Sequence, residues 1–184
     1  MVDEVVKHKF TVNDLQVMVQ AGLFDENARI ELLEGEIYHT SPINTPHARC
    51  VFKLNKYFYK YLDQSKYTFD SQNPLEIDDK TLLQPDLAVL NYRPDMYEKS
   101  LQAEDAVLVI EVADSSLKHD KRVKLPIYAG AGIPEYWIVD VNNERVEKYS
   151  EPEDGQYQPF QSAYREVTFN KVTIQLKDLF SPYV

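Results

Sequence analysis

The sequence predicts an α/β (α+β) fold, organised as one strand-rich domain over residues 1–184. A chain of this length is normally a single domain, and its core needs no disulfide or metal to hold it together. Its 43% hydrophobic and 27% charged residues are typical of a globular protein, and its 13 Tyr and 8 Phe favour strands. The run Val107–Val112 is almost entirely apolar, which is typical of a central strand buried on both faces.

An N-terminal helix and a hairpin open the predicted fold. Thr11 and Asp14 form a start similar to a capping box, so a helix is expected near 12–20. Two short extended runs, 29–33 and 36–40, flank a tight turn that contains a glycine, and this pattern predicts a β-hairpin.

A second helix is predicted to begin at Thr45, with threonine as the cap and proline at the first helical position. Placing successive residues 100° apart separates an apolar face from a basic face. The apolar face holds Val51, Leu54, Phe58, Tyr61 and Leu62. The basic stripe on the opposite face holds Arg49, Lys53, Lys56 and Lys60. Such a stripe is usually solvated surface, but it could also follow the phosphates of a nucleic acid.

Strands and one further helix are expected in the rest of the chain. The expected strands lie near 67–70, 75–77, 84–90, 107–112, 135–141 and 144–149, with two more within 165–176. Ser115 or Ser116 could cap a helix that runs to about Tyr128. Pro126 removes a backbone donor from this helix, so a kink is expected there.

The formal net charge of −10 argues against nucleic-acid binding, which usually leaves a basic surface. The positive charge is concentrated, however. Residues 49–66 and 118–124 hold nine of the 20 basic residues and only two of the 30 acidic ones. A basic surface is therefore compatible with an acidic chain.

The single cysteine, Cys50, rules out an internal disulfide and favours a reducing compartment. The N-terminal residues lack the apolar stretch of a secretory signal, and no apolar run is long enough to cross a membrane. These observations predict a cytoplasmic protein with no membrane partner.

Two carboxylates lie on otherwise apolar strands, Asp86 at the start of one and Glu111 near the end of the next. If these strands are antiparallel neighbours, both carboxylates lie at the same end of the sheet. Adjacent buried carboxylates repel, so they need a cation or a shared proton, and hard oxygen ligands suit Mg²⁺ or Mn²⁺. A lysine on the following helix could offset charge on a phosphate, although spacing alone does not select one. The basic residues of that helix are Lys118, Lys121, Arg122 and Lys124.

Several motifs together resemble the PD-(D/E)XK nuclease superfamily and, more narrowly, the Uma family of putative restriction endonucleases. The motifs are IELLEGEIY (30–38), PHARCV (46–51), QPDLAVL (84–90), VLVIEVADSS (107–116), DKRVKLPIYAGAGIPEYWIVDV (120–141) and VTIQLKDLF (172–180). The resemblance spans nearly the whole chain. It implies a restriction-endonuclease-like mixed β-sheet flanked by helices and Mg²⁺-dependent hydrolysis of DNA phosphodiester bonds.

The resemblance also implies roles for individual residues. Asp86 and Glu111 would bind the metal, with the backbone carbonyl of Val112 as a further ligand. The superfamily lysine would stand two residues after the glutamate, but Ala113 is there. The family pattern has a lysine four residues after an aspartate on the next helix, and these correspond to Lys124 and Asp120. Two auxiliary residues match family positions, Glu31 and His47.

Each of these residues also has a purely structural interpretation. Glu111 could form an ion pair with a helix lysine, Lys124 could lie on a solvated helix face, and His47 could be a structural histidine. Three functions therefore stay open. The first is a metal-dependent endonuclease that binds DNA through Arg49, Lys53, Lys56, Lys60 and Lys121. The others are a nuclease fold that only binds nucleic acid, and a self-associating assembly protein. A homodimer is expected, because duplex cleavage often uses two-fold symmetry.

Overall fold

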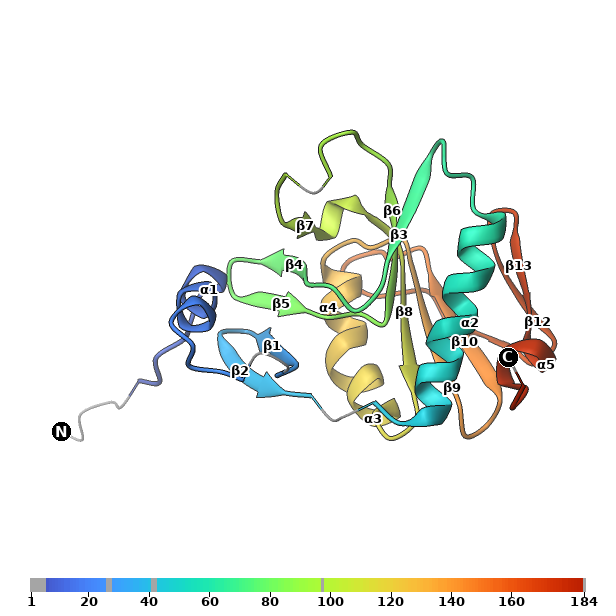
Figure 1. Cartoon of the computed structure of the whole chain (residues 1–184), viewed down its shortest axis with the longest axis horizontal. Helices are drawn as coiled ribbons and strands as arrows, with labels where there is room; N and C mark the ends of the chain where they lie inside the picture. Colours follow the sequence, from blue (N-terminus) through green and yellow to red (C-terminus); the bar gives the residue numbers. More distant parts are fainter. Residues whose placement is uncertain (1–5, 26–27, 41–42, 97, 184) are drawn as a thin grey trace.

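The computed structural model describes residues 6–25, 28–40, 43–96 and 98–183. Its centre is a six-stranded sheet in the order β11-β10-β9-β8-β6-β3 (Figure 1). Strands β8 and β9 are parallel and the other neighbours are antiparallel, so the sheet is mixed, as the resemblance implied. The strands are β3 (Tyr67–Asp70), β6 (Leu87–Asn91), β8 (Ala106–Ala113), β9 (Glu135–Asp140), β10 (Arg145–Ser150) and β11 (Gln161–Ala163).

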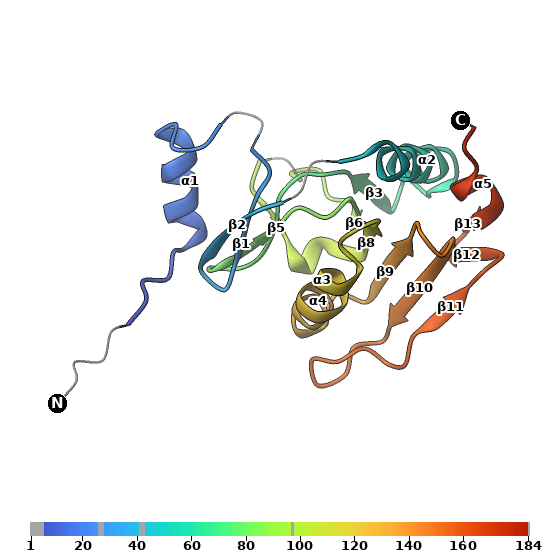
Figure 2. The same ribbon diagram turned by 90° about the horizontal axis from the view of Figure 1, so that it is seen from below.

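Helices cover the two faces of this sheet (Figure 2). Helix α2 (Thr45–Tyr61) packs on one face. On the other lies a continuous helical segment of α3 (Leu117–His119), a π-helical turn (Asp120–Lys124) and α4 (Leu125–Gly130). Because side chains alternate along a strand, Ile110 of β8 packs toward α2 while Val109 packs toward α4. Glu111 therefore projects on the α4 side.

A second sheet lies beside the first and carries the N-terminal elements (Figure 1). Its order is β2-β1-β5-β4-β7. Its strands are β1 (Ile30–Leu33), β2 (Glu36–His39), β4 (Leu75–Asp78), β5 (Thr81–Leu83) and β7 (Leu101–Gln102), followed by a 3₁₀ turn (Ala103–Asp105). Helix α1 (Val12–Gln20) packs on the β1–β2 hairpin through a separate small core that includes Val12 and Leu15. The expected helix and hairpin are confirmed.

One glycine is required in the hairpin turn. Gly35 has φ = 78°, and a Cβ atom at this position would lie 2.8 Å from Lys9 Cβ. The close approach lets Phe10 N–H donate to the Gly35 carbonyl at 3.0 Å. The chain leading into α1 is thereby tied to the hairpin.

Four predicted details differ from the structure. The run 84–90 is split, because Gln84–Asp86 connect β5 to β6 and Asp86 precedes its strand instead of beginning it. Pro85, which has no N–H to donate to a ladder, lies at the break. The cap of α2 is Asn44, whose Oδ1 accepts from His47 N–H at 3.0 Å, and not Thr45. Strand β7 and the 3₁₀ turn lie between the strands expected at 84–90 and 107–112 and were not predicted; residue 97, in the same stretch, lies outside the described residues.

The C-terminal part completes the α2 side of the core. The two expected final strands are β12 (Glu166–Phe169) and β13 (Val172–Gln175), which pair with each other. They are followed by a short helix, α5 (Leu176–Phe180), that was not predicted. Among the described helices, none combines the length and apolar character needed to cross a membrane.

Candidate metal and catalytic site

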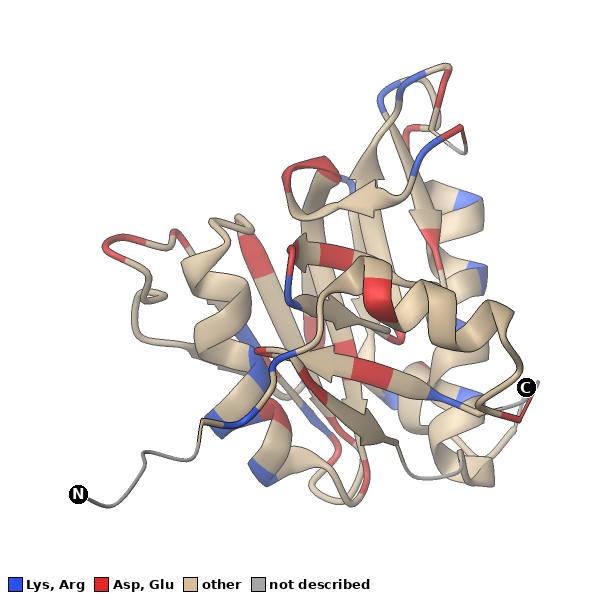
Figure 3. Ribbon diagram, turned by 90° about the vertical axis from the view of Figure 1, so that its left-hand side faces the viewer, with Lys and Arg blue, Asp and Glu red and all other residues tan. Residues whose placement is uncertain are grey.

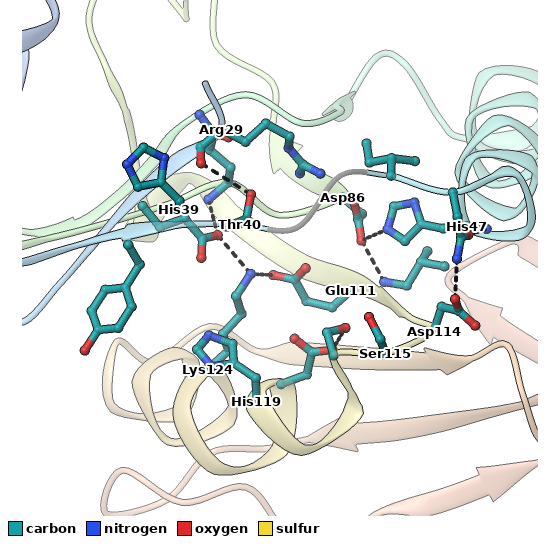
Figure 4. Close-up of a pocket in the computed structure, with 18 residues that line it drawn as sticks. Arg29, His39, Thr40, His47, Asp86, Glu111, Asp114, Ser115, His119 and Lys124 are labelled. Carbon is teal, nitrogen blue, oxygen red and sulfur yellow. Dashed lines mark hydrogen bonds and ion pairs between the residues drawn. The ribbon is translucent and has the colours of Figure 1, made fainter. Parts of the chain in front are cut away.

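A pocket of about 380 Å³ opens at one end of the central sheet, where four segments meet (Figure 4). Strand β1 contributes Glu31, the connection into β6 contributes Asp86, β8 contributes Glu111, and the π-helical turn contributes Lys124. The first turn of α2 adds His47. The structure thus brings together all of these residues, which the sequence placed up to 93 positions apart.

Asp86 and Glu111 lie at this end because β6 and β8 are antiparallel neighbours, as expected. Asp86 Oδ2 accepts hydrogen bonds from Val112 N–H at 2.9 Å and shares one with His47 Nε2 at 2.8 Å. Burial disfavours the charge on Asp86, but these two contacts outweigh it and hold the pKa of the carboxyl below its usual range. Asp86 is therefore ionised and held in place from two sides.

Glu111 is joined to Glu31 through Lys124. Lys124 Nζ donates to Glu31 Oε1 and to Glu111 Oε1, both at 2.9 Å. Burial raises the pKa of Glu111 to about 8, although the attraction of Lys124 opposes this rise. Burial disfavours the charge on Lys124 as well, but Glu111 and Glu31 outweigh it and raise its pKa above the usual value. The lysine is therefore a permanent cation in this cluster.

The backbone of β8 also contributes to the site. Val141 N–H donates to the Ala113 carbonyl at 3.0 Å, so that carbonyl faces the β9 side. Successive residues of a strand direct their backbone groups to opposite sides, and the Val112 N–H is already bonded to Asp86. The Val112 carbonyl therefore faces the same side as Asp86 and lies at the pocket that Val112 lines.

Acidic side chains outnumber the lysine and arginine side chains, Lys124 and Arg29, that line the pocket. Glu31, Asp86, Glu111 and Asp120 are buried at or beside it, and Lys124 is the fully buried amine among them. Within the described part of the chain, no three His, Cys, Asp or Glu side chains are grouped as a complete metal cage. Mg²⁺ needs less, because it usually keeps several waters and binds through one or two carboxylates. The two carboxylates, the Val112 carbonyl and the surplus charge fit such an ion.

Two further residues belong to this cluster: Tyr128, which was not predicted, and Asp120, which was named only as the aspartate of the family pattern. Tyr128 donates its hydroxyl hydrogen to Glu111 Oε1 at 2.9 Å, and Asp120 is buried beside Lys124 with its pKa raised by burial. Ser116 Oγ donates to Asp120 Oδ2 at 2.6 Å. Asp120, Lys124 and Tyr128 are spaced four residues apart, which is the signal for one shared helix face. The π-helical turn runs from Asp120 to Lys124 and ends two residues before Pro126, where a kink was expected.

The predicted DNA-binding residues separate into two groups. Arg49 is partly exposed and Lys56 and Lys60 are exposed on α2, where basic residues recur along the helix (Figure 3). Lys53 departs from the expected stripe. It is 7% exposed, and its Nζ donates to the carbonyls of Asp178 and Ser181 at 2.6 and 2.7 Å. Lys121 is likewise engaged, because its Nζ donates to the buried Glu147 at 2.7 Å. Neither amine is free for phosphate.

Comparisons with known proteins agree with this architecture. A crystal structure described as "a putative nuclease belonging to DUF820 from Anabaena variabilis" superposes with a TM-score of 0.72 at 16% identity. The match covers 93% of this chain and 97% of that one, and at this identity it shows a common fold. No curated protein matches the chain. The family model described as "Uma2: Putative restriction endonuclease" matches residues 14–177. The chain therefore belongs to the Uma2 family of putative restriction endonucleases.

Proposed function

We propose that this protein is a Mg²⁺- or Mn²⁺-dependent endonuclease that hydrolyses phosphodiester bonds in DNA. The observation that carries the proposal is the excess of buried carboxylates around Lys124 at the open end of β6 and β8. Buried carboxylates of like charge are costly unless a cation offsets them, and family membership supplies a function that needs such a cation.

In this proposal Asp86, Glu111 and the Val112 carbonyl hold the metal, which when bound would activate water and offset phosphate charge. His47 and the Val112 N–H fix one oxygen of Asp86 and leave Oδ1 with a single long contact, 3.4 Å from Gln72 Nε2. Lys124 and Tyr128 both hold Glu111 Oε1, so Oε2 is directed away from them as the second ligand. Glu31 holds Lys124 close to the reacting phosphate.

Lys124 is proposed as the catalytic lysine. Its ammonium lies beside both candidate ligand groups, where it can orient a water and offset the charge that develops on phosphorus-bound oxygen. Arg49, Lys56 and Lys60 are proposed to contact the phosphates of DNA. A cytoplasmic homodimer, with one site for each strand of a duplex, is part of the same proposal, and sedimentation at several concentrations would measure its oligomeric state.

Purified protein can be tested against linear, supercoiled and single-stranded DNA with Mg²⁺ or Mn²⁺. Wild type is expected to cleave at least one form, and Asp86→Ala and Glu111→Ala are each expected to abolish cleavage while circular dichroism shows an intact fold. Cleavage that survives in both variants would place the active site elsewhere.

A second candidate function is nucleic-acid binding without hydrolysis. It is favoured by Ala113, which stands where the superfamily has its lysine, and by the engagement of Lys124 with two glutamates. Calorimetric titration separates the two. Mn²⁺ binding that is lost in Glu111→Gln supports the enzyme, whereas the absence of metal binding in wild type supports the binding protein.

A further inference from the structure

The outward surface of α2 combines basic and aromatic side chains without any acid. No Asp or Glu occurs between residues 44 and 62. Phe52 is 53% exposed and Tyr59 is 72% exposed, and at helical spacing they flank Lys56. We call Arg49, Phe52, Lys56, Tyr59 and Lys60 the α2 platform. Two large aromatic side chains on one exposed helix face need an explanation, since the core does not use them.

A pocket of about 300 Å³ adjoins the platform on its other side. Its lining includes three tyrosines and two lysines of the helix and its surroundings (Tyr57, Tyr61, Tyr183, Lys56 and Lys60), together with one acid, Asp178. Lys60 Nζ stands 4.9 Å from the centre of the Tyr61 ring. The basic ridge of α2 is therefore bordered by aromatic rings on both sides.

The combination of basic and aromatic side chains favours some ligands of this surface over others. Phosphate contacts to a duplex need cations but no rings, because the bases of a duplex are already stacked on each other. A second copy docked by two-fold symmetry would bring one basic α2 against another, with no acid on either helix to offset the repulsion. Single-stranded nucleic acid uses both features, since its phosphates pair with lysine and its free bases stack on aromatic rings.

The platform and the candidate site share helix α2. His47, in the first turn of α2, contacts Asp86, and the helix rises about 1.5 Å per residue. Tyr59 therefore lies about 18 Å along the helix axis from His47. A strand bound along α2 leads toward the carboxylates.

We propose that the α2 platform binds single-stranded nucleic acid and presents an unpaired strand or flap to the site. This inference rests on the proposed function, because it names the substrate class of the same site. It concerns a surface away from the carboxylates, so binding can be measured without cleavage.

The test is fluorescence anisotropy in the presence of EDTA with a short labelled oligothymidylate, a labelled duplex and labelled oligouridylate. Wild type is expected to bind the single strands at least tenfold more tightly than the duplex. Phe52→Ala/Tyr59→Ala is expected to weaken single-strand binding by about tenfold or more, because each stacked ring contributes strongly. Lys56→Ala/Lys60→Ala should weaken binding and reduce its salt dependence.

Tyr92→Ala and Lys99→Ala are the matched controls, because both residues are exposed and neither belongs to α2, and neither is expected to change binding. Glu111→Gln should retain binding, so a failure of hydrolysis and a failure of the platform give different results. Equal affinity for duplex and single strands, or unchanged binding in Phe52→Ala/Tyr59→Ala, would overturn the proposal. It would also be overturned if that double variant abolished self-association of the protein and left nucleic-acid binding intact.

Discussion

Two buried glutamates, Glu111 and Glu147, meet lysines that stand three residues apart on the same helical segment. Glu147 is 0% exposed and is completely satisfied. Lys121 and Arg145 donate to its Oε1 at 2.7 and 2.8 Å, and Tyr149 donates to its Oε2 at 2.7 Å. Glu111 has to share its one amine, Lys124, with Glu31.

The two glutamates also differ in the balance of acidic and basic side chains around them. Glu147 and its neighbour Asp140 are balanced by Lys121 and Arg145, so two acids meet two cations. Around Lys124 the acids outnumber the buried amine, and one side of the cluster opens into the pocket. Balanced ion pairs hold elements together, whereas an unbalanced cluster beside a cavity can accept a further cation. The comparison therefore predicts a structural role for the Glu147 cluster and a functional role for the Glu111 cluster.

The largest expected difference in cleavage and stability is between the variants Glu111→Gln and Glu147→Gln. Glu111→Gln is expected to reduce metal-dependent cleavage by about a thousandfold, because a metal ligand loses its charge. Glu147→Gln should leave cleavage nearly unchanged but reduce the free energy of unfolding by about 3–5 kcal/mol, because two cations lose a buried partner. Single-turnover cleavage and urea unfolding measure the two effects. The functional assignment fails if Glu147→Gln loses cleavage while Glu111→Gln keeps it.

The two lysines provide the next contrast. Lys124→Met should reduce cleavage by about a hundredfold or more and destabilise the fold, since Glu31 and Glu111 lose their shared partner. Lys121→Met should cost only about 1 kcal/mol, because Glu147 keeps Arg145 and Tyr149. Cleavage rates and thermal unfolding of both variants test the contrast. Equal losses of cleavage would show that Lys124 acts only through stability.

The pH dependence of stability should show the effect of the excess of acidic side chains around Lys124. The pKa of Glu111 is 4.5 in an unfolded chain and about 8 in the folded protein. The folded protein therefore binds more protons between these values, and the free energy of unfolding should fall as the pH rises through this window. Glu111→Gln should lack most of this fall, and Mg²⁺ should offset it in wild type by binding the ionised carboxylate. Thermal unfolding from pH 5 to 8, with and without Mg²⁺, is the measurement. An identical pH profile for wild type and Glu111→Gln would contradict the raised pKa.

Two tyrosines give the smallest expected effects. Tyr128 and Tyr149 donate to Glu111 and Glu147 at 2.9 and 2.7 Å. Tyr149→Phe should cost about 1.5–3 kcal/mol of stability, because a hydrogen bond to a carboxylate paired with two cations is lost. Tyr128→Phe should cost about 0.5–1.5 kcal/mol at neutral pH, where Glu111 is mostly protonated. Only Tyr128→Phe should also reduce cleavage, by about tenfold, and it should weaken Mn²⁺ binding in calorimetry, since Tyr128 positions a proposed ligand. An equal loss of cleavage in Tyr149→Phe would contradict the proposed difference between Tyr128 and Tyr149.

The central part of the fold was predictable because its signals are local. The apolar run of β8 marks a buried strand, and the cap and proline mark the start of α2. Weaker elements were not predictable. Strand β7 has two residues and β11 has three, and α5 has five, so their formation depends on packing against the rest of the molecule. The misplaced role of Lys53 follows from this, because its partners are carbonyls at and beyond α5.

Some residues of the candidate site were predictable from the sequence and others were not. The positions of Asp86 and Glu111 followed from strand order alone once the strands were antiparallel neighbours. The choice between Lys121 and Lys124 did not, because both lie on the segment after β8 and only the resemblance favoured Lys124. Lys121 and Lys124 both lie in the π-helical turn, whose wider spacing per turn shifts the faces expected for an α-helix, and such turns leave no clear sequence pattern. Tyr128 was missed because a tyrosine at helical spacing usually belongs to the core.

The burial of Ala113 limits which side chains β8 can carry beside the candidate site. Ala113 lies on the same face of β8 as Glu111, is fully buried and packs among core residues on the α4 side. A lysine at this position would place its stem and charge in space that the core now fills. Ala113→Lys alone is therefore expected to destabilise the fold instead of supplying the pocket with a second amine.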